Sequence, residues 1–237
     1  MSLRRLFRDI GRRKDSRIVS AIDVTVDEWD IYRLREFMIG VSPYVVGFKI
    51  GIPTIFSFGL DNLNKIFQRI DDTLFIADVK LADIGYIGRK TSELIYKSGF
   101  HAIIIHGFIG FEGGLKDIIG YAYDIGLSTI LVAAMSHPGG EEYINRFTRT
   151  IIEKSLELPI DGYILPATYP NYIREFRDLI GDRLILCPGV GAQGAKPGSA
   201  IDMGADGEII GRLIYMDEKP ISRVRELHGV LRWRRRG

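Results

Sequence analysis

The sequence contains almost no cysteine: Cys187 is the only one among 237 residues. A single cysteine excludes an internal disulfide, and no cysteine–histidine cluster has the spacing of a zinc site. The first residues lack the apolar core of a signal peptide, and no apolar run is long enough to span a membrane. These absences predict a cytoplasmic chain with no metal site and no membrane contact.

The chain also has little net charge, +2, although 26% of its residues are charged. This balance predicts no nucleic-acid partner for the chain as a whole. Basic residues nevertheless gather at both ends, in an N-terminal extension over residues 1–16 and a tail over residues 232–237. They can be interpreted as solvated termini or as a weak tether for an anion or nucleic acid, and we expect solvated termini.

The sequence does contain a regular alternation of short apolar runs with longer amphipathic ones. The runs are apolar throughout rather than alternating, which is typical of parallel strands buried on both faces. Eight strands are predicted, at residues 17–23, 44–49, 74–80, 102–106, 129–135, 162–166, 184–188 and 207–211. The repeat averages roughly 30 residues, as in an α/β fold of the (β/α)8 or TIM-barrel type.

Each segment between predicted strands is long enough for one helix. A capping box, Thr25 to Glu28, predicts the start of the first of these helices. Later helices are predicted at residues 86–98, 115–123, 141–156, 171–179 and 221–231. No linker or change of composition divides residues 1–237, so we expect a single TIM-barrel domain. The alternative is an open doubly wound sheet, which would need two protected edge strands.

Charged residues of both signs follow the third predicted strand. Asp78 and Lys80 are two residues apart, so on a strand they point to the same side, and Asp83 comes just after the strand. Lys49 ends the preceding predicted strand. Burying such charges is costly unless they are paired. The pattern therefore indicates either a catalytic centre or a buried ion-pair network that only orders the barrel, and we favour the catalytic centre.

Active sites of (β/α)8 barrels lie at the carboxyl ends of the strands, so the residues at those ends are candidates for the site. Polar residues and turns end seven of the eight predicted strands: Asp23, Lys49, Asp78 with Lys80, His106, Ser136, Pro188 with Gly189, and Gly211 with Arg212. We therefore expect these groups to converge on one rim of the barrel.

Two features of this rim predict a phosphate site. A glycine-rich segment, residues 188–198, follows the seventh strand, and glycines let a backbone fold closely around an anion. Arg212 follows the eighth strand and offers a planar fork suited to phosphate oxygens. Phosphate sites after strands seven and eight are frequent in this fold.

Lys80 could act as a Schiff-base nucleophile or as a protonated acid. Neighbouring Asp78 and Asp83 favour the ammonium form, and so favour proton donation. The negative charge of Asp78 would repel a substrate carboxylate, and loss of CO2 would relieve that repulsion. Lys80 could then stabilise and protonate the remaining carbanion. No motif for an electron-sink cofactor is present, so no cofactor is expected.

The motifs resemble those of the orotidine 5'-phosphate decarboxylase family, in its short microbial and archaeal form. The similarity extends over about residues 17–220. Its motifs are Asp78-x-Lys80-x-x-Asp83-Ile84, residues 135–139 (Met-Ser-His-Pro-Gly), residues 188–194 (Pro-Gly-Val-Gly-Ala-Gln-Gly) and Gly211-Arg212. The resemblance implies an enzyme, a carboxy-lyase that converts orotidine 5'-phosphate to UMP and CO2 without a cofactor in pyrimidine biosynthesis.

The resemblance also implies roles for individual residues. Lys80 would be the proton donor, Asp78 the charge beside the substrate carboxylate, and Lys49 a ribose ligand that orders Asp78. Asp83 would reach the active site of a second subunit, which implies a homodimer with shared sites. The remaining substrate-binding residues implied in this way are Asp23, Ile84, Ser136, Pro188, Gly189, Val190, Gln193, Gly211 and Arg212.

One position departs from the family pattern. The family usually has threonine four residues after Asp83, where it supports ribose binding from the partner subunit; here that residue is Ile87. Two other functions are considered, the first because related enzymes share the Asp-x-Lys-x-x-Asp signature and the second because of Ile87. One is a metal-dependent sugar-phosphate decarboxylase or aldolase of the same superfamily, and the other is a non-catalytic nucleotide-binding barrel.

Overall fold

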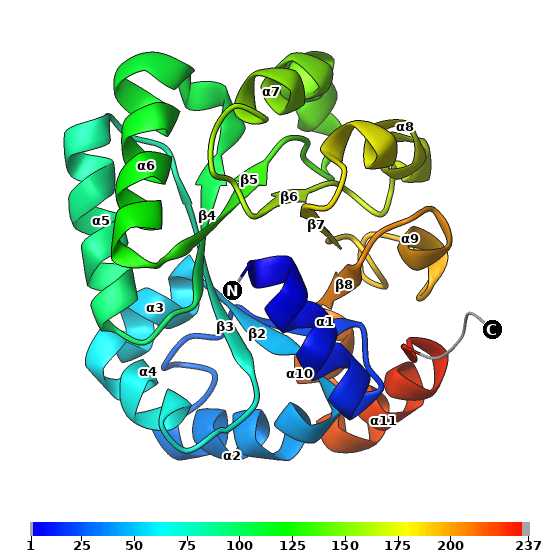
Figure 1. The fold of residues 1–237 in the computed structure, drawn as a ribbon. Coiled ribbons are helices and arrows are strands. Elements are labelled where there is room, and N and C mark those ends of the chain that lie inside the picture. The colour runs from blue at the N-terminus through cyan, green and yellow to red at the C-terminus, as the bar shows by residue number, and fades with distance from the viewer. Residues whose placement is uncertain (1, 234–237) are drawn as a thin grey trace.

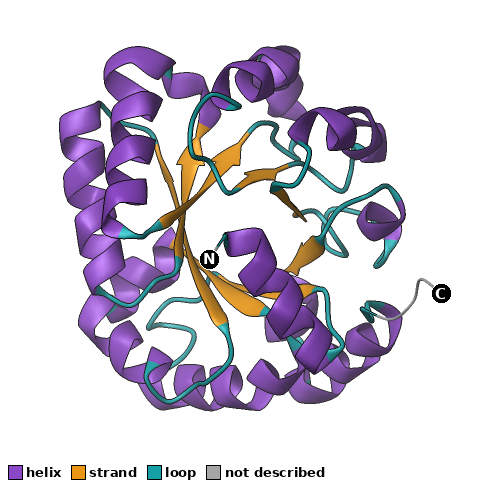
Figure 2. Ribbon diagram, in the orientation of Figure 1, coloured by secondary structure: helices purple, strands orange, loops and turns teal. Residues whose placement is uncertain are grey.

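Eight parallel strands close into a barrel in the computed structural model, which describes residues 2–233. Each strand pairs with the next, and β1 pairs with β8, so the sheet has no edge and the open-sheet alternative is wrong. Figure 2 shows the strands in orange, surrounded by helices. The strands are β1 (Ile18–Ile22), β2 (Gly47–Gly51), β3 (Leu74–Leu81), β4 (Ala102–His106), β5 (Ser128–Val132), β6 (Gly162–Ile164), β7 (Leu184–Cys187) and β8 (Gly207–Ile210).

A ring of helices covers the outside of the barrel, as Figure 1 shows, and apolar side chains fill the space between helices and strands. The helices are α1 (Leu3–Lys14), α2 (Ile31–Val41), α3 (Ile52–Phe58), α4 (Leu60–Phe67), α5 (Gly85–Lys97), α6 (Lys116–Ile125), α7 (Thr148–Ser155), α8 (Pro170–Ile180), α9 (Ser199–Asp202), α10 (Arg212–Tyr215) and α11 (Pro220–Val230). None of the helices within residues 2–233 is long and apolar enough to cross a membrane. The (β/α)8 prediction is confirmed.

Two predicted helices differ from the structure. The Thr25–Glu28 capping box does not open α2: the Glu28 carboxylate accepts the Thr25 N–H at 2.8 Å, but the segment forms a turn. The helix begins at Ile31, where the Asp30 carboxylate caps it by accepting the Arg33 N–H at 2.7 Å. The single helix predicted over residues 141–156 is instead two 3₁₀ turns followed by α7.

Helix α1 closes the amino-terminal end of the barrel, and the sequence pattern did not predict it. Leu3, Phe7 and Ile10 are buried, and Phe7 lies against Gly207 at the start of β8. The Leu3 N–H donates to the carboxylate of Asp161, next to the start of β6, at 3.3 Å. This end of the barrel is therefore plugged, and the carboxyl ends of the strands form the open end.

Candidate active site

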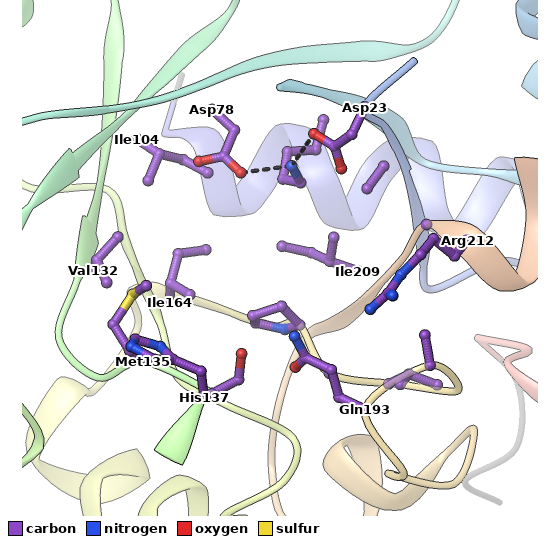
Figure 3. Close-up of a pocket in the computed structure, with 18 of the residues that line it drawn as sticks. Asp23, Asp78, Ile104, Val132, Met135, His137, Ile164, Gln193, Ile209 and Arg212 are labelled. Carbon is purple, nitrogen blue, oxygen red and sulfur yellow. Dashed lines mark hydrogen bonds and ion pairs between the residues drawn. The ribbon is translucent and has the colours of Figure 1, made fainter. Parts of the chain in front are cut away.

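The residues at the carboxyl ends of the strands surround one pocket of about 310 Å³. Figure 3 shows side chains from several strands converging on it. Eleven of the residues predicted from the sequence line this pocket: Asp23, Lys49, Asp78, Lys80, Ser136, Pro188, Gly189, Val190, Gln193, Gly211 and Arg212. Of the groups expected at the strand ends, His106 does not line the pocket, whereas the others do. This placement does not test their chemical roles.

Asp78 lies between two lysines at the base of this pocket. Its carboxylate accepts hydrogen bonds from Lys49 Nζ at 2.5 Å and from Lys80 Nζ at 2.8 and 3.0 Å. The side chains of Asp78 and Lys49 are 7% and 9% exposed, whereas that of Lys80 is 41% exposed and lines the pocket. Of the two ammonium groups, only that of Lys80 is accessible from the pocket. Its partner Asp78 is held in place by the buried Lys49.

The backbone of β3 is irregular where it places Lys80. Lys80 has a left-handed φ of 42°, and the register between β3 and β4 shifts between Ala77 and Leu81. A left-handed conformation is unfavourable for a residue with a side chain, and such strain is found at functional sites. The irregularity gives Lys80 its exposed position while its ammonium stays bonded to Asp78.

Burial and charge act in opposite directions on this network. Burial alone would lower the pKa of Lys49, but the carboxylates of Asp78 and Asp23 more than offset it and raise that pKa above its ordinary value. Burial alone would raise the pKa of Asp78, but Lys49 and Lys80 hold that pKa below its ordinary value. Both groups are therefore charged at neutral pH, as a fixed dipole in a largely dry site.

Asp23 completes the network from the neighbouring strand. Its carboxylate is 3.6 Å from Lys49 Nζ and remains partly exposed in the pocket. The approach depends on Gly51, because a Cβ at that position would overlap the Asp23 carboxylate, only 1.7 Å away. In Figure 3, Asp23 and Asp78 flank the lysine nitrogen to which both dashed lines run.

The residues predicted to bind phosphate lie on one side of the pocket. Gln193 and Arg212 both line it (Figure 3), and Arg212 is the first residue of α10. The glycine-rich segment folds into a tight turn in which the Gly191 N–H donates to the Ala195 carbonyl at 2.9 Å. Gly189, with a φ of 105°, adopts a backbone conformation unfavourable for other residues. The side-chain donors of Gln193 and Arg212 thus lie beside the glycine-rich turn at one edge of the pocket.

Asp83 and Ile84 are the two predicted site residues that do not line the pocket within one chain. The Asp83 carboxylate accepts the Ile84 N–H at 2.8 Å, and both side chains are exposed at the start of α5. Thr91, one turn beyond Ile87, donates its hydroxyl to the Ile87 carbonyl at 3.1 Å. This part of the predicted site therefore lies outside the pocket of its own chain.

The sequence-based prediction missed the apolar wall of the pocket. Ile104, Val132, Ile164 and Ile209 lie on its walls, each on a different strand. Residues that alternate along each strand from its carboxyl end point into the barrel, so counting by twos would have found them. Tyr215 of α10 also lines the pocket, and its sequence position carries no signal of this.

His106 ends β4, but it does not line the pocket. Its ring lies 4.2 Å from that of Phe108, and its Nδ1 is buried without a hydrogen-bond partner within residues 2–233. Burial, with the nearby charge of Lys80, lowers the pKa of His106 to about 4. The imidazole is therefore neutral at pH 7.

This depressed pKa predicts a loss of stability in acid. An unfolded chain protonates histidine near pH 6.5, whereas folded His106 resists protonation down to about pH 4. The unfolded state thus binds the proton first, and stability falls as pH drops through this window. Thermal unfolding at pH 7, 5.5 and 4 should show that Tm falls less with decreasing pH for His106→Gln than for the wild type. An equal fall of Tm in both proteins would contradict this account.

Neither the pocket nor the rest of residues 2–233 contains three or more His, Cys, Asp or Glu side chains arranged to hold a metal ion. The Asp, Lys and Arg side chains of the pocket supply two ammonium groups, two carboxylates and one guanidinium. Such a set suits an anionic substrate whose charge changes during reaction.

Comparison with known proteins links this geometry to one family. Residues 16–227 match the model of the "Orotidine 5'-phosphate decarboxylase / HUMPS family". A protein of Methanosarcina mazei named orotidine 5'-phosphate decarboxylase is 38% identical over 204 residues, covering 86% of this chain and 89% of that protein. A protein of Aeropyrum pernix with the same name is 36% identical, covering 88% of this chain and 86% of its own length.

Solved structures give the same result. The orotidine 5'-monophosphate decarboxylase of Methanocaldococcus jannaschii, complexed with the inhibitor BMP, superposes with a TM-score of 0.82 at 28% identity, covering 91% of this chain and 98% of that one. The orotidine 5'-phosphate decarboxylase of Pyrococcus horikoshii superposes with a TM-score of 0.79 at 32% identity, covering 90% and 98%.

Proposed function

Because the chain belongs to the orotidine 5'-phosphate decarboxylase / HUMPS family of enzymes, we propose that it converts orotidine 5'-phosphate to UMP and CO2 without a cofactor. The reaction would serve pyrimidine biosynthesis. The observation that carries this proposal is the Lys49–Asp78–Lys80 network, which sets a fixed carboxylate beside an accessible ammonium in a pocket of nucleotide size.

The substrate phosphate would bind at the pocket edge formed by Gln193, Gly211 and Arg212. The pyrimidine would then lie over the apolar wall of Ile104, Val132 and the neighbouring strands, and the ribose would face Asp23 and Lys49. Phosphate binding far from the reacting carbon orients the base, and this binding energy can lower the barrier at that carbon.

The chemical step would follow from the charges. The substrate carboxylate would lie beside Asp78, whose negative charge is held in place by Lys49. Breaking the carbon–carboxylate bond releases neutral CO2 and leaves the electron pair on the ring carbon. The repulsion disappears and the ammonium of Lys80 stabilises the new charge, so the site is more complementary to the transition state than to the bound substrate.

Lys80 would then complete the reaction as the acid. An N–H proton moves from its Nζ to the ring carbon, giving UMP and a neutral amine, which regains a proton from solvent. Lys80 is suited to this role because it is partly exposed to the pocket while Asp78 accepts its hydrogen bonds. Lys49 is buried and bonded to Asp78, so its role is to position that carboxylate and bind ribose.

A direct test is the loss of orotidine 5'-phosphate absorbance with purified protein in the presence of EDTA. We expect turnover that EDTA does not reduce. Absence of turnover by folded protein would reject the activity and favour a non-catalytic nucleotide-binding barrel. EDTA-sensitive turnover of a sugar phosphate would instead assign the chain to the metal-dependent enzymes of the superfamily.

Replacing Arg212 with alanine is expected to raise KM for orotidine 5'-phosphate by roughly 10- to 100-fold, the effect of losing charge-assisted hydrogen bonds to phosphate. Arg212→Lys keeps the positive charge but loses the planar fork, so its KM should lie between those of the wild type and Arg212→Ala. Steady-state kinetics measure both effects. If Arg212→Ala has the KM of the wild type, Arg212 does not bind the phosphate.

The protein would act as a homodimer with shared active sites. Asp83 is exposed at the start of α5, outside its own pocket. Ile84 at the N-cap of α5, with Ile87 and Leu94 in the helix, presents an apolar side; these side chains are 62%, 39% and 58% exposed. An exposed apolar side next to Asp83, which forms no ion pair within residues 2–233, fits an interface that delivers Asp83 to a second pocket.

Mixing two inactive variants tests the shared site. Lys80→Ala and Asp83→Asn each damage both sites of a homodimer, but a heterodimer of the two keeps one site with both wild-type residues. After subunit exchange, about half of the subunits are in heterodimers, so activity should recover to roughly a quarter of the wild-type value. Lack of recovery despite confirmed exchange would place Asp83 outside the neighbouring site.

A further inference from the structure

The charge of this chain is strongly segregated along the sequence, which its net charge of +2 conceals. Residues 1–17 contain seven basic and two acidic side chains, and residues 228–237 contain four basic and no acidic ones. These two segments therefore carry +9, and residues 18–227 carry −7. Most of both basic segments lies outside residues 16–227, the part that matches the family model.

The described residues of the two basic segments are packed together at the closed end of the barrel. The Trp233 ring lies 6.5 Å from that of Phe7 in α1, and the Trp233 N–H donates to the Asp15 carbonyl at 3.3 Å. His228 in α11 contacts the carbonyl of Lys14, the last residue of α1, at 2.9 Å. The described parts of both segments, residues 2–17 and 228–233, thus lie together at the end of the barrel opposite the pocket, and residues 234–237 of the basic tail lie outside the described residues.

Some of these cations are used within the fold. Arg4 pairs with Asp182 and Asp206, and Arg13 pairs with Asp72. The Lys14 ammonium donates to two backbone carbonyls and to the Thr73 hydroxyl. These interactions hold α1 in place against the barrel, and they leave a second group of arginines on its outer side.

Arg5, Arg8 and Arg12, here called the arginine face, lie on one side of α1 at spacings of three and four residues. Within residues 2–233, the only ion pair they form is a long one, 3.9 Å, from Arg5 to Asp9. All three line an open hollow of about 430 Å³, and its acidic members, Asp9 and Asp182, already contact Arg5 and Arg4. The arginine face therefore has guanidinium groups free to bind an external anion.

We propose that the arginine face binds the phosphate backbone of nucleic acid without sequence preference. Arginine suits this ligand because its planar fork matches phosphate oxygens. Arg5 and Arg12 are seven residues apart, about 10 Å along the helix, which is comparable to roughly three nucleotides at about 3.4 Å each along one strand. A row of cations of this length fits a chain of phosphates better than a single small anion.

A membrane surface is a less suitable partner for this helix. Helices that lie on bilayers insert an apolar face below the headgroups. In α1, Leu3, Phe7 and Ile10 are at most 2% exposed because they plug the barrel. No comparable apolar face remains for lipid, so anionic vesicles serve as a contrasting ligand in the test.

Fluorescence anisotropy with a fluorescein-labelled 20-nucleotide RNA tests the proposal. The triple variant Arg5→Gln, Arg8→Gln, Arg12→Gln should raise Kd at least ten-fold at 50 mM salt. It should also reduce the steepness of the plot of log K against log salt by about 2, since each lost phosphate contact on a single strand contributes about 0.7 to the slope. Decarboxylase activity should not change, because the pocket is at the other end of the barrel.

A matched control lowers the net charge equally at exposed positions elsewhere, with Lys65→Gln, Arg69→Gln and Arg174→Gln. This control should change Kd less than three-fold, and replacing the arginine face with three lysines should retain part of the binding. Equal losses in the two glutamine variants, or no loss in either, would overturn the proposal. So would wild-type protein that binds phosphatidylserine vesicles but not the RNA.

Discussion

Lys80→Ala is expected to lower kcat by roughly 10⁴-fold or more while the protein still binds UMP. In the proposed mechanism, the variant would lack both the proton donor and the cation that stabilises charge on the ring carbon. Proton transfer by a side chain typically contributes about 10²–10⁴-fold, and electrostatic stabilisation about 10²–10³-fold. UMP lacks the reacting carboxylate and would be held mainly by the phosphate and ribose groups, so its affinity should change little.

Single-turnover absorbance measurements and UMP calorimetry together test this prediction. Lys65→Ala is the matched control, because Lys65 is an exposed lysine on α4, outside the pocket. It should behave as the wild type in both measurements. Near-normal turnover by Lys80→Ala would reject the proton-donor assignment, whereas loss of UMP binding would mean that Lys80 acts mainly in binding.

Asp78→Asn is expected to separate binding from chemistry. The asparagine keeps the shape of Asp78 but removes its negative charge, so the substrate carboxylate of the proposed complex would face two ammonium groups without the repelling carboxylate. Orotidine 5'-phosphate should therefore bind more tightly, while kcat falls roughly 10³-fold because the repulsion relieved in the transition state is gone. Weaker substrate binding with an unchanged kcat would contradict the role given to Asp78.

The same variant should also be less stable. Lys49 would stay buried with only Asp23, 3.6 Å away, as an anionic partner, and breaking a buried pair in this way costs about 3–5 kcal/mol. Denaturant unfolding measures this loss. Asp61→Asn, at an exposed position of α4, provides the control and should leave both stability and kinetics unchanged.

The predicted strands agree well with the structure because each is a short apolar run between polar turns. All eight exist, and β4 has the predicted bounds of residues 102–106. Helices were harder to predict, since their ends depend on competing caps. Asp30 rather than Thr25 caps α2, and the connection between β2 and β3 contains two helices separated at Gly59, where one was expected.

The position of α1 shows why the termini could not be interpreted from composition. A run of arginines suggested solvated ends, but Phe7 and Ile10 lie between them in the sequence and plug the barrel. Three-dimensional packing alone brings Trp233 against Phe7. The contact between Trp233 and α1 is therefore a tertiary property, while residues 234–237 of the predicted basic tail lie outside the described residues.

The amino-acid sequence by itself determined the barrel and most of its candidate site, because strand periodicity and strand ends are local features. Polar residues at successive strand ends had to meet on one rim once the sheet closed. Only the tertiary structure decided how the charges pair. Lys49 is buried against Asp78, Lys80 is exposed to the pocket on a left-handed backbone, and Asp83 lies outside the pocket. Pairing depends on register, burial and close approach between strands, which no spacing in the sequence specifies.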